Sequence, residues 1–255
     1  MHNLEQSFNR QFILGYGDDA SLSLANMRLR YQVWCVENNY FPLSSFSDGI
    51  ERDEYDKRSL YVVLSSQIRD LDIATARVVL HDPSDNAARF PIEQFIMLRR
   101  HERDAYLSVP RELVGEISRF CVSKVFRRRA REFSTTHGIA PNEGVGEGKR
   151  NFSYITLGLF KGLVAVSLAA KLEYWYALME PSLLKMLKIY GIHFKAIGPT
   201  VNYYGVRQPC MAPIESVLDG IRKNSDEIGE FVCPYTPSHG VLTNEGLFPR
   251  GNNVN

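Results

Sequence analysis

Arginines and carboxylates occur inside segments that are otherwise apolar, where a charged side chain is costly to bury unless it is paired. One set combines three arginines with three carboxylates, spread over a helical segment, a loop and two strand-like runs. Its members are Arg30, Asp53, Asp56, Arg77, Glu116 and Arg119. Trp34 follows Arg30 by one helical turn and shares its helix face. We expect the six ionic residues to form a mutual network that orders a functional site.

The elements that must position these residues follow from the hydrophobic pattern. A helix over 20–37 is expected to carry Arg30 and Trp34, and 38–56 reads as a long ordered loop of the kind that often carries function. Apolar runs, alternating in places, predict strands at 12–16, 60–64, 73–80 and 114–122. Within 114–122 the alternation breaks at Arg119 and Phe120, which indicates a β-bulge.

The second half of the chain alternates between helical and strand-like segments. Short helical starts are expected at Pro91 and at Pro181, where proline suits the first helical position. Further helices are expected at 153–172 and 214–222, and further strands at 174–179, 201–204 and 210–214. This order predicts an α/β fold of the α+β kind, a sheet covered by helices. We expect one domain over 1–224, with a polar mobile insertion at 132–152 and a polar C-terminal tail over 225–255.

Several other chemistries lack support. The chain contains no G-x-S-x-G hydrolase motif, and its Gly144-x-Gly146-x-Gly148 run does not sit between a strand and a helix. The four cysteines form no C-x-x-C pair and lie near no histidine cluster, so no metal site is expected. With a net charge of +1 and no known module, nucleic-acid binding is not expected.

The cellular location is predicted from two patterns. The longest apolar run, 162–170, is too short to cross a bilayer, and the first residues lack the pattern of a signal peptide. We therefore expect a cytoplasmic protein with no transmembrane segment, although contact with a membrane surface stays open.

Four motifs appear in an order and spacing that resembles the acyl-homoserine-lactone (autoinducer) synthases. They are Arg30-Tyr-Gln-Val-Trp34, Glu51-Arg-Asp53-Glu-Tyr-Asp56, Ala76-Arg77-Val-Val and Glu116-Ile-Ser-Arg119-Phe. Other stretches resemble more closely the acyltransferases associated with the PEP-CTERM/exosortase system and the N-acyl-amino-acid synthases. They include Ser118-Arg-Phe-Cys-Val-Ser-Lys124 and Met179-Glu-Pro-Ser182. The resemblance covers roughly residues 10–220 and implies the GNAT fold, whose central strands splay to admit a pantetheine arm.

The resemblance also implies an activity: transfer of a fatty acyl group from an acyl-carrier thioester, acyl-ACP or acyl-CoA, to the amine of a small molecule. No permanently bound cofactor is implied. Amide formation needs a base near the amine, and Glu116 is the first candidate, with Arg119 beside it. A salt bridge from Glu116 to Arg119 or Arg77 is an equally favoured reading of the same residue. Backbone N–H groups near Phe120, Cys121 and Val122 are expected to meet the developing oxyanion.

The remaining charged residues are assigned to the substrate pocket and to the acyl carrier. Trp34 would pack over a substrate pocket shaped by Arg30, Asp53, Asp56 and Arg77, with scaffolding or ordinary core as the alternative for each. After the strand 114–122 comes a basic cluster, Lys124, Arg127, Arg128, Arg129 and Arg131. Because the usual Gly-rich pyrophosphate loop is absent there, we expect the cluster to dock an acidic acyl carrier protein, or else to be a solvated charge run.

Three functions therefore remain open. The first is an N-acyltransferase that makes an N-acyl amino acid or a related compound. The second is a true acyl-homoserine-lactone synthase that uses S-adenosylmethionine. The third is a non-catalytic acyl-binding module on a GNAT scaffold, which the joint presence of the ionic residues argues against.

Overall fold

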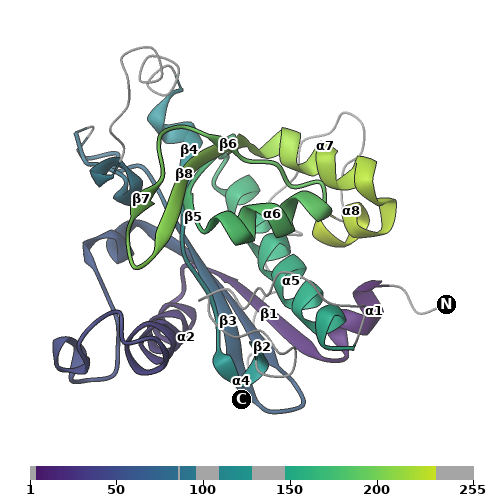
Figure 1. Ribbon diagram of the computed structural model, residues 1–255, viewed down its shortest axis with the longest axis horizontal. Coiled ribbons are helices and arrows are strands. Elements are labelled where there is room, and N and C mark those ends of the chain that lie inside the picture. Colours follow the sequence, from purple (N-terminus) through teal and green to yellow (C-terminus); the bar gives the residue numbers. More distant parts are fainter. Residues whose placement is uncertain (1–3, 86, 96–108, 128–146, 234–255) are drawn as a thin grey trace.

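The computed structural model describes residues 4–85, 87–95, 109–127 and 147–233. Its sheet has eight strands in the order β1-β2-β3-β4-β5-β8-β6, with β7 paired to β8 (Figure 1). The strands are β1 (Phe12–Gly17), β2 (Ser59–Ser66), β3 (Leu71–Val79), β4 (Val114–Val122), β5 (Tyr174–Met179), β6 (Lys195–Ala196), β7 (Val201–Asn202) and β8 (Val206–Pro213). In the described sheet every pairing is antiparallel except that of β4 with β5.

Helices cover both faces of this sheet. They are α1 (Leu4–Asn9), α2 (Ala20–Arg30), α4 (Lys124–Arg127), α5 (Glu147–Ala169), α6 (Pro181–Ile189), α7 (Ile214–Asn224) and α8 (Asp226–Val232). A π-helix, Tyr31–Glu37, continues α2, and 3-10 turns lie at Leu43–Phe46, Glu54–Arg58, Pro91–Gln94 and Arg111–Leu113. The expected α+β sheet covered by helices is therefore confirmed.

The two faces of the sheet can be read from β3. Ala74 and Ala76 belong to the main core, which includes Phe160 and Leu163 of α5. The intervening Thr75 accepts a hydrogen bond of 2.5 Å from Asn26 of α2. Because side chains alternate across a strand, α5 and α2 lie on opposite faces of the sheet (Figure 1).

Local signals explain where the helices begin and end. Asp19 caps α2, accepting a 2.9 Å hydrogen bond from the Leu22 N–H. Pro181 opens α6, and Gly191 follows its end with φ 77°, a conformation that glycine adopts without strain. A Cβ at Gly191 would also lie 2.1 Å from the carbonyl oxygen of Gly220. This close approach packs the end of α6 against α7.

Several predicted boundaries differ from the structure. The expected helix over 20–37 is α-helical only to Arg30 and then becomes a π-helix. The expected strand at 210–214 is β8, which begins at Val206, and 201–204 is reduced to the two residues of β7. These strands are short or polar, and the apolar pattern alone placed their ends wrongly.

The expected insertion and tail are both shorter than predicted. Helix α5 begins at Glu147, inside the expected insertion at 132–152. Residues 226–232, expected to lie in a polar tail, form α8, and its Phe231 is buried against Phe8 with ring centroids 4.9 Å apart. The described fold therefore continues to Cys233, because the buried side chains of Phe231, Val232 and Cys233 anchor this short polar segment. The rest of the insertion, 132–146, and residues 234–255 lie outside the described part.

Candidate active site

A β-bulge lies in the middle of β4. The register with β3 runs from Ser118 opposite Arg77 to Cys121 opposite Thr75, so Arg119 and Phe120 together face Ala76. Arg119 has φ 53°, which is unusual for a residue with a side chain and turns the backbone at this point. The bulge predicted from the sequence is therefore present.

The bulge changes which side chains share a face of the sheet. The Nε atom of Arg77 donates to Ser118 Oγ at 3.1 Å, and Arg77 also shares Asp53 with Arg119. The adjacent residues Ser118 and Arg119 therefore both lie on the α2 face, which regular alternation would forbid. Phe120 returns to the α5 face, where its ring centroid lies 6.1 Å from that of Phe160.

The sheet opens beside the bulge. Strands β4 and β5 are paired only from Val114 to Ile117 on β4 and from Tyr174 to Ala177 on β5. Beyond this point β4 continues beside β3 as far as Val122, and β5 continues beside β8 to its own end. The two strands diverge, and a cleft lies at the divergence. It is lined by Trp34, Pro91, Ile92, Phe95, Glu116, Ile117, Ser118, Arg119, Phe120, Leu178, Met179, Leu183, Tyr203 and Arg207.

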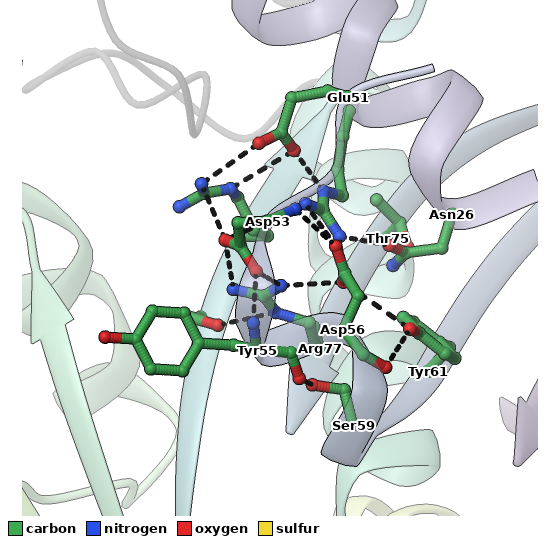
Figure 2. Close-up of polar contacts among 12 residues, drawn as sticks. Asn26, Glu51, Asp53, Tyr55, Asp56, Ser59, Tyr61, Thr75 and Arg77 are labelled. Carbon is green, nitrogen blue, oxygen red and sulfur yellow. Dashed lines mark hydrogen bonds and ion pairs between the residues drawn. The ribbon is translucent and has the colours of Figure 1, made fainter. Parts of the chain in front are cut away.

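Three arginines, of which Arg30 and Arg77 are fully buried, and three carboxylates form one ion network next to this cleft (Figure 2). Arg30 binds Glu51 and, at 2.6 Å, Asp56. Arg77 lies 2.6 Å from Asp53 and 2.7 Å from Asp56. Arg119 completes the network with contacts of 3.0 Å to both Glu51 and Asp53. Each charge thus has at least two opposite partners, which offsets the cost of removing it from water.

The loop sequence positions two of these carboxylates itself. Asp53 caps the 3-10 turn Glu54–Arg58, accepting a 3.0 Å hydrogen bond from the Tyr55 N–H. Asp56 reaches back to accept from the Asp53 N–H at 2.8 Å, which completes a capping box. The hydroxyl of Tyr61 donates to the carbonyl oxygen of Asp56 at 2.9 Å. The Asp-x-x-Asp spacing therefore fixes the loop and points two carboxylates at the arginines.

The network holds its carboxylates ionised. Burial on its own would raise the pKa of Glu51, but Arg119 and Arg30 outweigh it and hold that pKa at about 2. Burial likewise opposes ionisation of Asp56, and Arg30 and Arg77 bring its pKa to about 2. The three guanidinium and three carboxylate charges balance.

Glu116 lies outside this network. Its side chain is on the α2 face, lines the cleft and is 2% exposed. Within the part of the chain that the structure describes it forms no ion pair; Oε2 accepts a 2.8 Å hydrogen bond from the backbone N–H of Ile92. Burial raises the pKa of Glu116 to about 8, only partly offset by the Ile92 N–H and the charge of Arg77. The salt-bridge reading of Glu116 is therefore wrong, because Glu51 takes the place expected for it.

Aromatic side chains form one wall of the cleft. The guanidinium carbon of Arg119 lies 5.0 Å from the ring centroid of Trp34, a cation–π contact. Trp34 stacks on Phe41 at 5.9 Å, and Tyr204 lies edge-on to Phe41 at 5.2 Å. Tyr203 and Tyr204 come from the turn between β7 and β8. These contacts join the turn between β7 and β8 to the segment that follows α2.

The structure does not bring every expected residue to the cleft. Cys121 and Val122 are fully buried and in register with Thr75 and Ala74, so of the three expected backbone positions only Phe120 lines the cleft. The Lys124 side chain donates to the carbonyl oxygen of Glu37, and its N–H donates to the Glu37 carboxylate at 2.9 Å. Lys124 therefore helps to end the π-helix. Arg127 closes α4. Arg128, Arg129 and Arg131 lie outside the described residues.

Sequence reasoning did not select two charged residues of the site. Glu51 was visible as part of the acidic stretch before Asp53, but nothing in its spacing separated it from its neighbours. Arg207 lies 5% exposed at the start of β8, where it pairs with Glu180 at 3.1 Å. The sequence showed Glu180 directly before the Pro181 helix start, but nothing in it indicated that Arg207 would be its partner.

The described residues contain neither a metal centre nor a membrane-spanning helix. Among them no group of three or more histidine, cysteine, aspartate or glutamate side chains is arranged to hold a metal ion. None of the described helices combines the length and the apolar character that crossing a bilayer demands.

Known proteins resemble this chain in part of its sequence and in its fold. Residues 29–135 match the family described as acetyltransferase (GNAT) domain. No curated protein matches the chain in sequence.

Solved structures give a broader likeness. A crystal structure of TofI, in a ternary complex with an inhibitor and MTA, has a TM-score of 0.55 and 17% identity, covering 83% of this chain and 96% of TofI. FeeM, an N-acyl amino acid synthase from uncultured soil microbes, has a TM-score of 0.54 and 9% identity, covering 84% and 97%. BjaI, a CoA-dependent acyl-homoserine lactone synthase with SAM and isopentyl-CoA, has a TM-score of 0.50 and 15% identity, covering 82% of each chain. The chain therefore has the GNAT fold.

Proposed function

We propose that this protein is an N-acyltransferase that moves a fatty acyl group from a carrier thioester, acyl-ACP or acyl-CoA, to the amine of an amino acid or similar small molecule. The observation that carries the proposal is Glu116: a buried carboxyl without an ion-pair partner among the described residues, placed where β4 and β5 part. The match to the acetyltransferase (GNAT) domain and the fold likeness to FeeM and the lactone synthase support it.

The chemistry needs one proton acceptor and one leaving thiol. The amine nitrogen attacks the thioester carbonyl carbon, and the C=O electrons move onto oxygen to give a tetrahedral intermediate. When the C=O bond re-forms, the C–S bond breaks and the thiolate leaves. The ionised form of Glu116 takes a proton from the attacking nitrogen, directly or through water. The same proton then passes from Glu116 to the thiolate, which leaves as a thiol, and the ionised carboxylate is restored. A carboxyl with a pKa of about 8 is a competent base near neutral pH.

The bulge supplies a place for the thioester. The turn at Arg119 shifts the register of β4 against β3, three residues after Glu116. On its other side this part of β4 is no longer paired with β5. In our proposal backbone N–H groups near Phe120 face the carbonyl oxygen and stabilise its negative charge in the intermediate. Arg30, Asp53, Asp56, Arg77 and Arg119 act by holding this edge in place, and Arg119 and Trp34 also contact the acceptor.

The acyl chain would occupy the apolar side of the cleft. Ile117, Phe120, Met179 and Leu183 line it and belong to the main core. An acyl chain between the diverging strands would extend that core, so burial of its methylene groups adds binding energy.

The acyl donor and the cellular setting are part of the proposal. Lys124, Arg127, Arg128, Arg129 and Arg131 would dock the acidic surface of an acyl carrier protein. Such a carrier implies a cytoplasmic reaction. The resemblance to acyltransferases of the PEP-CTERM/exosortase system stays a prediction, which the genes beside that of this protein would test.

A second candidate is an acyl-homoserine-lactone synthase. It is favoured by the likeness to BjaI, whose structure contains SAM and isopentyl-CoA. In that case the acceptor amine belongs to S-adenosylmethionine, and acylation is followed by lactone closure. The two candidates share the acyl donor and the role of Glu116, and they differ in the product.

A thiol-release assay with product identification by mass spectrometry tests both. The protein is given long-chain acyl-ACP or acyl-CoA with the common amino acids or, separately, with S-adenosylmethionine. We expect an N-acyl amino acid, formed by wild type and lost in Glu116→Gln. Glu112→Gln, an exposed carboxyl four residues earlier, is the matched control and should retain activity. A lactone would establish the second candidate, and tight donor binding with no thiol release would leave an acyl-binding module.

A further inference from the structure

The indole of Trp34 contains a polar atom that the rest of the fold leaves unused. Trp34 is 6% exposed, lines the cleft and packs on Phe41. Its Nε1 atom is buried and has no hydrogen-bond partner among the described residues. A buried donor without an acceptor is destabilising, so native proteins keep few of them, and those they keep ask for an explanation.

The other tryptophan of the chain shows the ordinary arrangement. Trp175 lies fully buried in the main core, and its Nε1 donates to Ser167 Oγ at 2.8 Å. This side chain does not line the cleft. The indole N–H of the core tryptophan therefore has a hydrogen-bond acceptor in the protein, whereas that of the cleft tryptophan has none among the described residues.

A cationic group lies over the ring that contains the unused donor. The Arg119 guanidinium lies over the Trp34 ring, 5.0 Å from its centroid, and also lines the cleft. The hydrogen bonds of Arg119 to Glu51 and Asp53 run through Nε and Nη2, which leaves the Nη1 edge outside them. Two side chains that line one cleft thus each have an N–H donor outside the hydrogen bonds of the described residues, and a ligand that suits such a pair of donors is an anionic group with two oxygens.

The charge of the surroundings favours a zwitterion. The ion network contains three arginines and three carboxylates, and Arg207, which also lines the cleft, is paired with Glu180. A ligand that brings an ammonium and a carboxylate leaves this balance unchanged, whereas a lone cation or a lone anion would disturb it in a site of low dielectric constant.

We propose that Trp34 Nε1 and the Nη1 edge of Arg119 bind the carboxylate of an α-amino acid acceptor, which places its amine toward Glu116. This inference rests on the proposed acyl transfer, since only that reaction makes the amino acid an acceptor. To that proposal it adds a specific recognition site for the acceptor's carboxylate. It makes the free carboxylate, and not the side chain, the feature that every acceptor must share.

Two-dimensional NMR of the indole N–H groups tests the site without any turnover. The chain has two tryptophans, so the ¹⁵N-labelled protein gives two indole signals, assigned with Trp34→Phe and Trp175→Phe. Each common amino acid and its primary amide is added without acyl donor. We expect at least one amino acid to move the Trp34 signal downfield, its amide to leave it in place, and the Trp175 signal to stay unchanged throughout.

Kinetics with Trp34→Phe give the second measurement. The variant keeps an aromatic ring against Phe41 and removes the N–H. Its KM for the amino acid should rise by about 10-fold or more, the usual effect of losing a hydrogen bond to a charged group. The amide should be a poor acceptor for wild type and variant alike, and the KM for the acyl donor should not change; a merely structural role of Trp34 would not produce this pattern.

Two results would overturn the inference: a Trp34 signal that no amino acid moves, or one that amino acids and their amides move equally. Failure of the proposed function has a different signature. If amino acids move the Trp34 signal but no thiol is ever released, the carboxylate site stands and acyl transfer does not.

Discussion

The backbone N–H of Ile92 lies 2.8 Å from Oε2 of Glu116, and this hydrogen bond spans 24 residues of sequence. It comes from the 3-10 turn Pro91–Gln94, which lies on the cleft. The turn therefore fixes the carboxyl from one side, and in our proposal the other oxygen faces the acceptor amine. The carboxyl, the ion network and the cleft wall each lead to a testable expectation.

The first prediction concerns the pH dependence of catalysis. Glu116 must be ionised to accept a proton, and its pKa is raised to about 8 by burial. The value of kcat/KM should therefore increase with pH up to about 8 and level off above it, unless titration of the acceptor amine adds a second limb. Glu116→Gln should lower kcat by about 10²- to 10⁴-fold, the usual contribution of a general base. A wild-type profile that is flat from pH 6 to about 9 would exclude this role.

The second prediction concerns stability and the same carboxyl. The folded pKa of Glu116 lies above its unfolded value, so its contribution is complete below about pH 4.5 and is lost as pH rises through about 8. Glu116→Gln removes this penalty. Urea unfolding should show the variant gaining stability relative to wild type as pH rises from 5 to about 8, by up to about 1.4 kcal/mol per pH unit. Glu112→Gln, with an exposed side chain, should show no such trend.

The third prediction concerns the ion network. Arg30 is fully buried, and its loss would leave Glu51 and Asp56 without one of their partners. Arg30→Met should therefore destabilise the fold by about 3–5 kcal/mol, as when one member of a buried pair is removed. Arg28→Met, on the exposed side of α2, is the control and should change little. Chemical denaturation of both variants measures the difference, and equal stabilities would show that the network contributes nothing.

The network also predicts the response to acid. The pKa values of Glu51 and Asp56 are held at about 2, below their unfolded values. Their contribution is present at neutral pH and is lost as pH falls from about 4.5 to about 2. Circular dichroism over this range should show the Glu51→Gln variant losing less stability on acidification than wild type, although it starts from a lower value.

The fourth prediction concerns the length of the acyl chain. Leu183 of α6 is buried and lines the cleft, whereas Leu187, one turn later, is buried away from it. Leu183→Phe should shift the preference to shorter acyl donors, since the larger ring takes space next to Met179. Leu187→Phe should lower stability by about 1–3 kcal/mol through overpacking and leave the preference unchanged. A competition assay with donors of several lengths separates the two outcomes.

Much of the fold could be predicted because its strands carry strong local signals. The pattern over 114–122 gave β4 with both ends correct and the bulge in its place, and 174–179 gave β5 equally well. The π-helix could not be predicted, because Tyr31–Glu37 has an ordinary helical composition and nothing in it marks the change of hydrogen-bond pattern after Arg30. Helix α8 was missed because, besides its neighbour α7, it packs against α1 and α5, which lie far away in sequence.

The residues of the site could be predicted, but their pairing could not. Because charges in apolar strands must be paired, we expected Arg30, Arg77 and Arg119 to meet the carboxylates of the acidic loop. The sequence did not show that Glu51 would take two of these arginines and leave Glu116 alone. That choice depends on the bulge, which turns Arg119 toward the loop, and so on three-dimensional register.

The single parallel pairing of the described sheet has a consequence for how the molecule assembles. Strands β2 and β3 are consecutive and joined by a tight turn, so their contacts are local and close early. The pairing of β4 with β5 needs the whole crossover through α5 and unites only four residues of each strand. We expect it to be a late step of folding, because loop closure must precede the contacts that stabilise it. The cleft lies where this pairing ends. A chain in which only the first four strands have paired would therefore still lack the cleft.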